Sequence, residues 1–148
     1  MRVAPKLAVA VLAMLTAGAV TACSSSGSVS TSTGPTAASA PATAATLGAE
    51  EFAAALKRPD TVLLDVRTAE EYASGHLPGA TNVDVNSPDF AQTVGALDRA
   101  KAYALYCRSG NRSAVAMQAM QQLGFTHVFH LGGGIGAWTA AGGDTVKD

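Results

Sequence analysis

The chain of 148 residues contains little charge, few aromatic side chains and only two cysteines. Charged residues make up 14% of the sequence, aromatic residues make up 5%, and the formal net charge is −1. Nucleic-acid binding depends on a basic surface, so this nearly neutral composition gives no indication of a nucleic-acid partner. Much of the hydrophobic content is alanine, and the length suits a single folded domain.

The first 22 residues have the organisation of an export signal. Arg2 and Lys6 give a positive start, and residues 7–20 form an uncharged apolar stretch of 14 residues. This stretch is short for a permanent membrane span but suits the centre of a signal peptide. The ending Val20-Thr21-Ala22-Cys23 resembles the lipobox of bacterial lipoproteins. That resemblance implies lipidation at Cys23 and an extracytoplasmic protein that is lipid-anchored to a bacterial membrane. An ordinary secretory signal is the alternative.

A segment without charge follows Cys23. Residues 24–46 contain no Asp, Glu, Lys or Arg, and Val29 is their only larger apolar residue. Such a Ser/Thr/Ala/Pro-rich composition cannot bury enough surface to offset the entropy of ordering. We therefore predict a disordered tether over residues 23–46, with a mean reach of roughly 25 Å, followed by a folded domain over 47–148.

Within the domain, apolar runs alternate with segments of helical periodicity. The runs predict strands over residues 61–66, 80–84, 102–106 and 128–131. The periodic segments predict helices over residues 48–56, 68–72, 88–97, 113–123 and 135–141, with Thr68 as a helix cap. Alternating strands and helices indicate an α/β sandwich around a central parallel sheet.

Cys107 follows the predicted strand 102–106 and precedes the predicted helix 113–123. In α/β folds, ligands bind beyond the carboxyl ends of the strands. Unpaired N–H groups at a helix start stabilise an anion there, so they lower the pKa of a thiol. Arg108 and Arg112 add positive charge nearby. We predict that Cys107 is a reactive thiolate rather than an inert buried residue.

Four segments carry a resemblance to a known family. They are Leu63-Leu64-Asp65-Val66-Arg67 with Glu70-Glu71-Tyr72, Gly75-His76-Leu77-Pro78-Gly79-Ala80-Thr81-Asn82, Cys107-Arg108-Ser109-Gly110-Asn111-Arg112-Ser113, and Leu131-Gly132-Gly133-Gly134 with Ala137-Trp138. In this order they resemble the two signatures, the active-site loop and the closing motif of single-domain rhodaneses, which are sulfurtransferases. The resemblance implies a rhodanese-like three-layer sandwich with a central parallel sheet.

The resemblance also implies a persulfide mechanism at Cys107. The sulfane sulfur of thiosulfate or a related donor would pass to Cys107 and then to cyanide or a thiol, without a cofactor. The residues fit this chemistry, because the loop N–H groups can form an anion-binding nest and the two arginines can hold sulfonate oxygens. The residues expected to bind substrate are Arg108, Ser109, Gly110, Asn111, Arg112 and Ser113. We expect a monomer.

Other polar residues are expected to support the site. Asp65 ends a strand on the same sheet edge and can accept loop N–H bonds or pair with an arginine, and Arg67 can pair with Glu71. We expect structural roles for His76 and Trp138. Unusual backbone angles or a close approach are expected at the glycines 132–134. His127 and His130 lack metal-ligand spacing with any cysteine, so no metal is predicted.

Two alternatives remain open. The first is a cysteine phosphatase or an arsenate reductase. The pattern of cysteine phosphatases has five residues between the thiolate and the arginine, whereas four residues separate Cys107 from Arg112. The shorter loop favours a compact sulfur group. A carrier that delivers persulfide sulfur to a protein partner, without turnover on small acceptors, is the second alternative.

Overall fold

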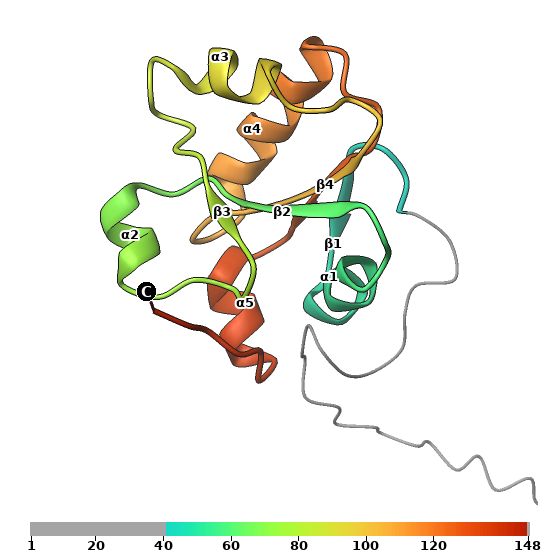
Figure 1. Cartoon of the computed structure of the whole chain (residues 1–148). Coiled ribbons are helices and arrows are strands. Elements are labelled where there is room, and N and C mark those ends of the chain that lie inside the picture. Colours follow the sequence, from blue (N-terminus) through green and yellow to red (C-terminus); the bar gives the residue numbers. More distant parts are fainter. Residues whose placement is uncertain (1–40, 148) are drawn as a thin grey trace, which may run out of the picture.

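The computed structural model describes residues 41–147 of the chain (Figure 1). Within this range, no helix has the length and apolar character needed to cross a membrane. The predicted signal peptide, Cys23 and most of the predicted tether lie outside the described residues.

A single sheet of five parallel strands forms the middle layer. Its strands are β1 (Ala45–Leu47), β2 (Thr61–Asp65), β3 (Thr81–Asn82), β4 (Ala102–Tyr106) and β5 (Val128–Leu131), arranged in the order β1-β5-β4-β2-β3. The helices are α1 (Ala49–Leu56), α2 (Ala69–Ala73), α3 (Phe90–Gly95), α4 (Asn111–Gln122) and α5 (Gly134–Ala140). All the strand pairs are parallel, which confirms the predicted α/β fold.

Helices cover both faces of the sheet. Figure 1 shows α3 and α4 on one side of the sheet and α1 and α5 on the other. Along β4, Tyr103 and Leu105 join the core beneath α3 and α4, whereas Ala104 and Tyr106 join the core beneath α1 and α5. Successive side chains of a strand point to opposite faces, so burial on both faces explains the continuous apolar runs in the sequence.

Three aromatic rings join the core of the α1 and α5 face. Phe52 contacts Phe129 edge to face, with ring centroids 6.1 Å apart, and contacts Trp138 in the same manner at 6.4 Å. Trp138 is fully buried and donates a hydrogen bond to the Asp144 carbonyl. This confirms the predicted packing role of Trp138 and fixes the start of the C-terminal segment.

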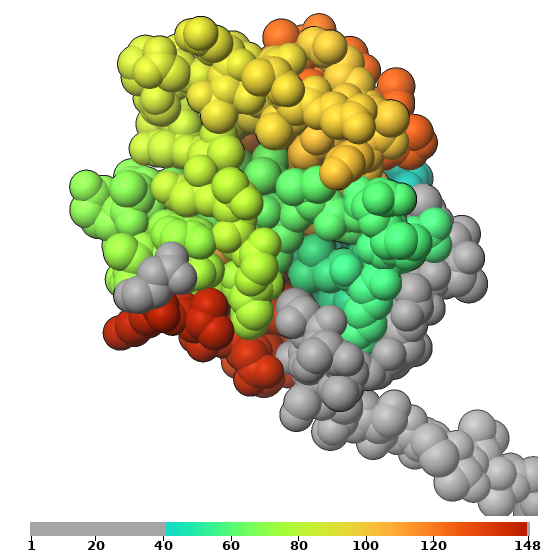
Figure 2. Space-filling view, viewed as in Figure 1, coloured from blue at the N-terminus to red at the C-terminus, as the bar shows by residue number. Residues whose placement is uncertain are grey.

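The C-terminal segment then returns to the carboxyl edge of the sheet. His76 and Val146 exchange two backbone hydrogen bonds of 2.9 Å each. The segment therefore runs alongside the loop that follows α2, as Figure 2 shows at the lower left of the molecule. His76 is buried and stacks on the Tyr72 ring, which agrees with the structural role predicted for it.

The predicted and observed elements differ mainly at the edges of the sheet. β3 is reduced to two residues, because the chain pairs with β2 only at Thr81 and Asn82. The sequence pattern does not predict β1, and Ala45 and Thr46 belong to this strand rather than to the predicted tether. A three-residue edge strand has no periodicity of its own, and only pairing with β5 defines it. α4 begins at Asn111, two residues before its predicted start.

Phe52 provides a direct test of this packing. We expect Phe52→Ala to lower the free energy of unfolding by about 3–5 kcal/mol, because it leaves a cavity between two aromatic rings. Urea denaturation measures the change. Val115→Ala, at a helix position that is 59% exposed, is the control and should change stability by less than about 0.5 kcal/mol. Similar losses in the two variants would contradict the assigned core.

Candidate active site

The candidate site is at the carboxyl end of β4. Cys107 follows this strand directly, and its side chain is buried with 1% of the residue exposed. Asp65 ends the neighbouring strand β2 and is the register partner of Tyr106. The topology thus brings Asp65 and Cys107 to the same sheet edge, as the sequence predicted.

The loop after Cys107 turns its amide groups toward the sulfur atom. The Gly110 N–H donates to Sγ over 3.1 Å. Gly110 has a φ angle of 99°, and a Cβ atom there would lie 3.1 Å from the Gly133 nitrogen. The left-handed conformation and the close approach together favour glycine at this position.

The hydrogen bonds around Cys107 decide its charge. Burial by itself raises the pKa of the thiol. Hydrogen bonds from the Ser113 hydroxyl and from the amides of Ser113, Ser109 and Gly110 outweigh burial, so the pKa lies below its usual value. The thiolate predicted from sequence is therefore favoured, chiefly by the loop and the first turn of α4.

Helix α5 holds the other side of the loop. The Ile135 N–H donates to the Cys107 carbonyl over 2.8 Å, and the Gly136 N–H donates to the Arg108 carbonyl over 3.4 Å. A Cβ atom on Gly134 would approach the Cys107 carbonyl oxygen to 2.3 Å, and Gly134 has a φ angle of 58°. Both the close approach and the unusual backbone angle expected among the glycines 132–134 are confirmed.

A buried ion pair supports the edge of the site. The Nε and Nη2 atoms of Arg67 donate to the carboxylate of Asp65 over 2.9 and 2.5 Å. Nη2 also donates to the Gly75 carbonyl over 2.8 Å. Only 5% of the Arg67 side chain and none of the Asp65 side chain is exposed. A buried charge needs such a partner, so the pair fixes the loop that follows α2 against the end of β2.

The predicted Arg67–Glu71 pair is wrong. Glu71 accepts two hydrogen bonds from Arg112, over 2.6 and 2.7 Å. The spacing rule behind the prediction applies within a helix, and Arg67 precedes the first residue of α2. Glu71 instead joins the start of α2 to the start of α4, across 41 residues of sequence.

The residues predicted to bind substrate have three different environments. Ser113 and Gly110 are buried around the sulfur atom, whereas Arg108, Ser109 and Asn111 are exposed. Arg112 is half-buried and holds Glu71. Among these residues, Arg108 and Ser109 line a pocket beside the loop.

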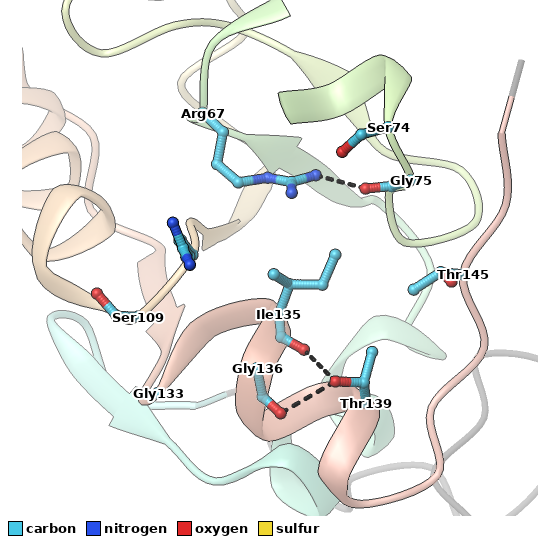
Figure 3. A pocket seen from close by; sticks show the side chains of 10 residues that line it. Arg67, Ser74, Gly75, Ser109, Gly133, Ile135, Gly136, Thr139 and Thr145 are labelled. Atoms are coloured by element: carbon cyan, nitrogen blue, oxygen red, sulfur yellow. Dashed lines mark hydrogen bonds between the residues drawn. The ribbon is translucent and has the colours of Figure 1, made fainter. Parts of the chain in front are cut away.

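This pocket has a volume of about 540 Å³ (Figure 3). Arg67 and Gly75 form one side, and Ile135, Gly136 and Thr139 of α5 form another. Thr145 of the C-terminal segment completes the rim. The volume is in the range of small-molecule sites, and the lining combines two guanidinium groups with an apolar side chain.

Sequence reasoning gave His130 no role at the site. In the structure, His130 Nδ1 lies 3.0 Å from the Ser113 hydroxyl, and Nε2 lies 2.9 Å from the Thr46 hydroxyl. His130 is 5% exposed, in a strand where every residue is buried. The signal available in the sequence was that His130 is a polar residue within an otherwise apolar run. In residues 41–147, no three His, Cys, Asp or Glu side chains form a group able to hold a metal.

The Glu71–Arg112 pair predicts a pH-dependent stability. The hydrogen bonds from Arg112 lower the pKa of Glu71 from 4.5 to about 2. The carboxylate therefore stabilises the fold fully above about pH 4.5, and this contribution is lost as the pH falls toward 2. We expect Glu71→Gln to cost about 1 kcal/mol at pH 7, because the pair is partly solvent-screened, and nothing near pH 2.

Urea denaturation at several pH values measures this difference. Glutamine can still accept the helix-capping bond from the Thr68 N–H, so the substitution removes the charge without removing the cap. In an Arg112→Met background the same substitution should cost much less. An equal cost in both backgrounds would show that the pair does not stabilise the protein.

The comparisons with known proteins agree with this geometry. A family model described as the rhodanese-like domain matches residues 48–141. The chain is 37% identical over 89 residues to the thiosulfate sulfurtransferase GlpE of Pseudomonas fluorescens, covering 60% of this chain and 79% of GlpE. It is also 37% identical over 93 residues to the uncharacterized protein slr1261 of Synechocystis, covering 62% of this chain and about half (51%) of that protein.

A solved structure is similar as well. The crystal structure of a rhodanese-related protein from Thermoplasma volcanium aligns with a TM-score of 0.63 and 29% identity, over 70% of this chain and 99% of that one. The matched region contains the sheet from β2 to β5, the Cys107 loop and the glycines that approach it. The chain belongs to the rhodanese-like family, whose members similar to it include a sulfurtransferase.

Proposed function

We propose that the protein is a sulfurtransferase that moves a sulfane sulfur from thiosulfate, or a related donor, to a thiophilic acceptor through a persulfide on Cys107. The observation that carries the proposal is the buried sulfur atom surrounded by donors, with the Gly110 N–H at 3.1 Å. Such a site stabilises negative charge on sulfur, both as a thiolate and as a persulfide. The similarity to a thiosulfate sulfurtransferase supports the same reaction class.

In the first half-reaction, the Cys107 thiolate attacks the outer sulfur of thiosulfate. A bond forms between Sγ and that sulfur, the S–S bond of thiosulfate breaks, and sulfite leaves with the bonding electron pair. The anionic persulfide that remains needs no proton from the protein. The covalent intermediate divides one transfer into two easier displacements.

In the second half-reaction, the acceptor attacks the terminal sulfur of the persulfide. Cyanide leaves as thiocyanate, or a thiolate leaves as a persulfide, and the Cys107 thiolate is regenerated. The pocket of about 540 Å³ beside Arg108 has room for an acceptor much larger than cyanide. This volume supports a thiol as well as an inorganic anion as the acceptor.

The contacts of the two loop arginines support different roles for them. Arg112 donates from both Nη atoms to Glu71, so it serves mainly to join α2 and α4. Arg108 is exposed and lines the pocket, so we assign to it the attraction of the anionic donor. The same contacts weigh against a phosphatase, because that chemistry requires the loop arginine to bind the transferred oxyanion.

Replacing each cysteine separately tests the proposal. We expect the full chain, purified in detergent, to form thiocyanate from thiosulfate and cyanide at steady state. Cys107→Ser should reduce the rate by at least about a thousandfold, because serine forms no persulfide. Cys23→Ser is the matched control and should retain the rate.

Intact-mass measurement after thiosulfate treatment separates the alternatives. The wild-type protein should gain one sulfur atom, and cyanide should remove it. A gain of one sulfur without turnover would favour the carrier that delivers persulfide to a protein partner. Neither sulfur gain nor turnover would exclude both sulfur-transfer proposals.

We also propose that the protein is lipid-anchored at Cys23 on the outer side of a bacterial membrane. The apolar stretch 7–20 and the ending Val20-Thr21-Ala22-Cys23 support this proposal. In a bacterial host given labelled palmitate, the wild-type and Cys107→Ser proteins should carry the label and sediment with membranes. Cys23→Ser should lose the label, and a label that persists in this variant would contradict the anchor.

A further inference from the structure

Three polar side chains connect the edge strand β1 to the sulfur atom. Thr46 and His130 are register partners in β1 and β5, with Oγ1 and Nε2 2.9 Å apart. On the other side of the ring, Nδ1 lies 3.0 Å from the hydroxyl of Ser113, and hydrogen bonding by this hydroxyl lowers the pKa of Cys107. His130 and Ser113 are 5% and 0% exposed. Neighbouring protein groups, rather than water, therefore decide the direction of the hydrogen bonds among these three side chains.

The Ser113 hydroxyl has one hydrogen and three possible acceptors. They are the Gly110 carbonyl at 3.0 Å, the Nδ1 atom of His130 and the Cys107 thiolate. The Gly110 carbonyl accepts the Ser113 hydroxyl and also the Ala114 N–H over 3.0 Å, so it keeps a partner when the hydroxyl hydrogen turns to another acceptor. The competition is therefore between the imidazole and the thiolate, and the tautomer of His130 decides it.

Burial lowers the pKa of His130, so the ring is neutral near pH 7 and carries one hydrogen. With the hydrogen on Nε2, Nδ1 is an acceptor and takes the Ser113 hydrogen away from sulfur. With the hydrogen on Nδ1, the ring donates to the Ser113 oxygen and leaves the hydroxyl hydrogen for the thiolate. In that case Nε2 must accept from a donor, and the Thr46 hydroxyl lies 2.9 Å from it.

We propose that His130 is a positioning residue for the sulfur chemistry: it is held as the Nδ1–H tautomer by the Thr46 hydroxyl and directs the Ser113 hydroxyl to the Cys107 sulfur. This inference deepens the proposed function, because it assigns the control of the same nucleophile. A donor at its oxygen also makes the Ser113 O–H a stronger donor. His130 itself does not contact the sulfur or the substrate.

The backbone around Thr46 is built for this contact. The Gly132 N–H donates to the Leu47 carbonyl over 2.9 Å, which closes β1 against the end of β5. A Cβ atom on Gly132 would lie 2.9 Å from the Thr46 methyl group. Glycine at position 132 thus lets the Thr46 side chain lie over the end of β5, with its hydroxyl within hydrogen-bonding distance of the imidazole.

A spectroscopic measurement tests the tautomer directly. In full-length protein with Cys23→Ser and ¹⁵N-labelled histidine, a long-range ¹H–¹⁵N spectrum distinguishes protonated from unprotonated ring nitrogens. We expect a protonated Nδ1 and an unprotonated Nε2 for His130 at a pH where Cys107 is a thiolate. A hydrogen on Nε2 would overturn the proposal, and this test requires no change at the site.

A double-mutant cycle tests whether His130 acts through Ser113. The pKa of Cys107, the only thiol in the Cys23→Ser background, is read from the pH dependence of its alkylation by iodoacetamide. We expect Ser113→Ala to raise this pKa by about one unit, and His130→Leu to raise it by about half a unit. In the Ser113→Ala background, His130→Leu should have no further effect.

Thr46→Val supplies a second, nearly isosteric perturbation at the far end of the chain of contacts. It should raise the Cys107 pKa in the same direction as His130→Leu, and again only when Ser113 is present. No shift in either variant, or equal shifts with and without Ser113, would overturn the proposal. Alkylation requires no sulfur transfer, so these outcomes are independent of whether the protein forms thiocyanate.

Discussion

The stabilisation of negative charge on a buried sulfur atom is the constraint on which the site depends. Cys107 is 1% exposed, and an anion removed from water is stable only when protein donors replace the solvent. The loop meets this requirement by turning its amides toward sulfur, and Gly110 adopts the left-handed conformation that this turn needs. The loop carbonyls consequently face the other way, where those of Cys107 and Arg108 accept hydrogen bonds from the amides of Ile135 and Gly136 in the first turn of α5. Helix α5 therefore helps to hold the Cys107 loop, although none of its side chains donates to the sulfur atom.

Most of the charged side chains around the Cys107 loop are paired with one another. Asp65 with Arg67 and Glu71 with Arg112 are two neutral pairs, one buried and one half-exposed. The Glu71–Arg112 pair joins α2 to α4, and Arg67 of the other pair also donates to the Gly75 carbonyl in the loop that follows α2. The pairs contribute little net attraction for an anion, so Arg108 at the pocket is left as the exposed cation of the loop. This division separates the paired groups that maintain the shape of the site from Arg108, to which we assign the attraction of the donor.

Much of the fold was predictable because burial leaves a pattern in the sequence. The limits of β4 and β5 agree with the apolar runs at 102–106 and 128–131, since strands covered on both faces are apolar throughout. Thr68 caps α2 as expected, with the Glu71 N–H donating to its hydroxyl. The prediction failed at Ala45 and Thr46, where a short edge strand has the same composition as the linker before it. It also failed for Arg67, whose partner is a strand residue rather than a residue one helical turn away.

The sequence by itself determined the position of Cys107 between a strand and a helix, the glycines that let the backbone approach it, and the alternation of strands and helices from β2 onward. These properties are local, because they follow from residue type, periodicity and the spacing of a few neighbouring residues. The tertiary structure decided which arginine holds Glu71, which strand completes the sheet, and that His130 lies between Thr46 and Ser113. These contacts join residues 17 to 84 positions apart. Periodicity shows which side of a segment is buried, but only the packed sheet determines which side chain lies opposite.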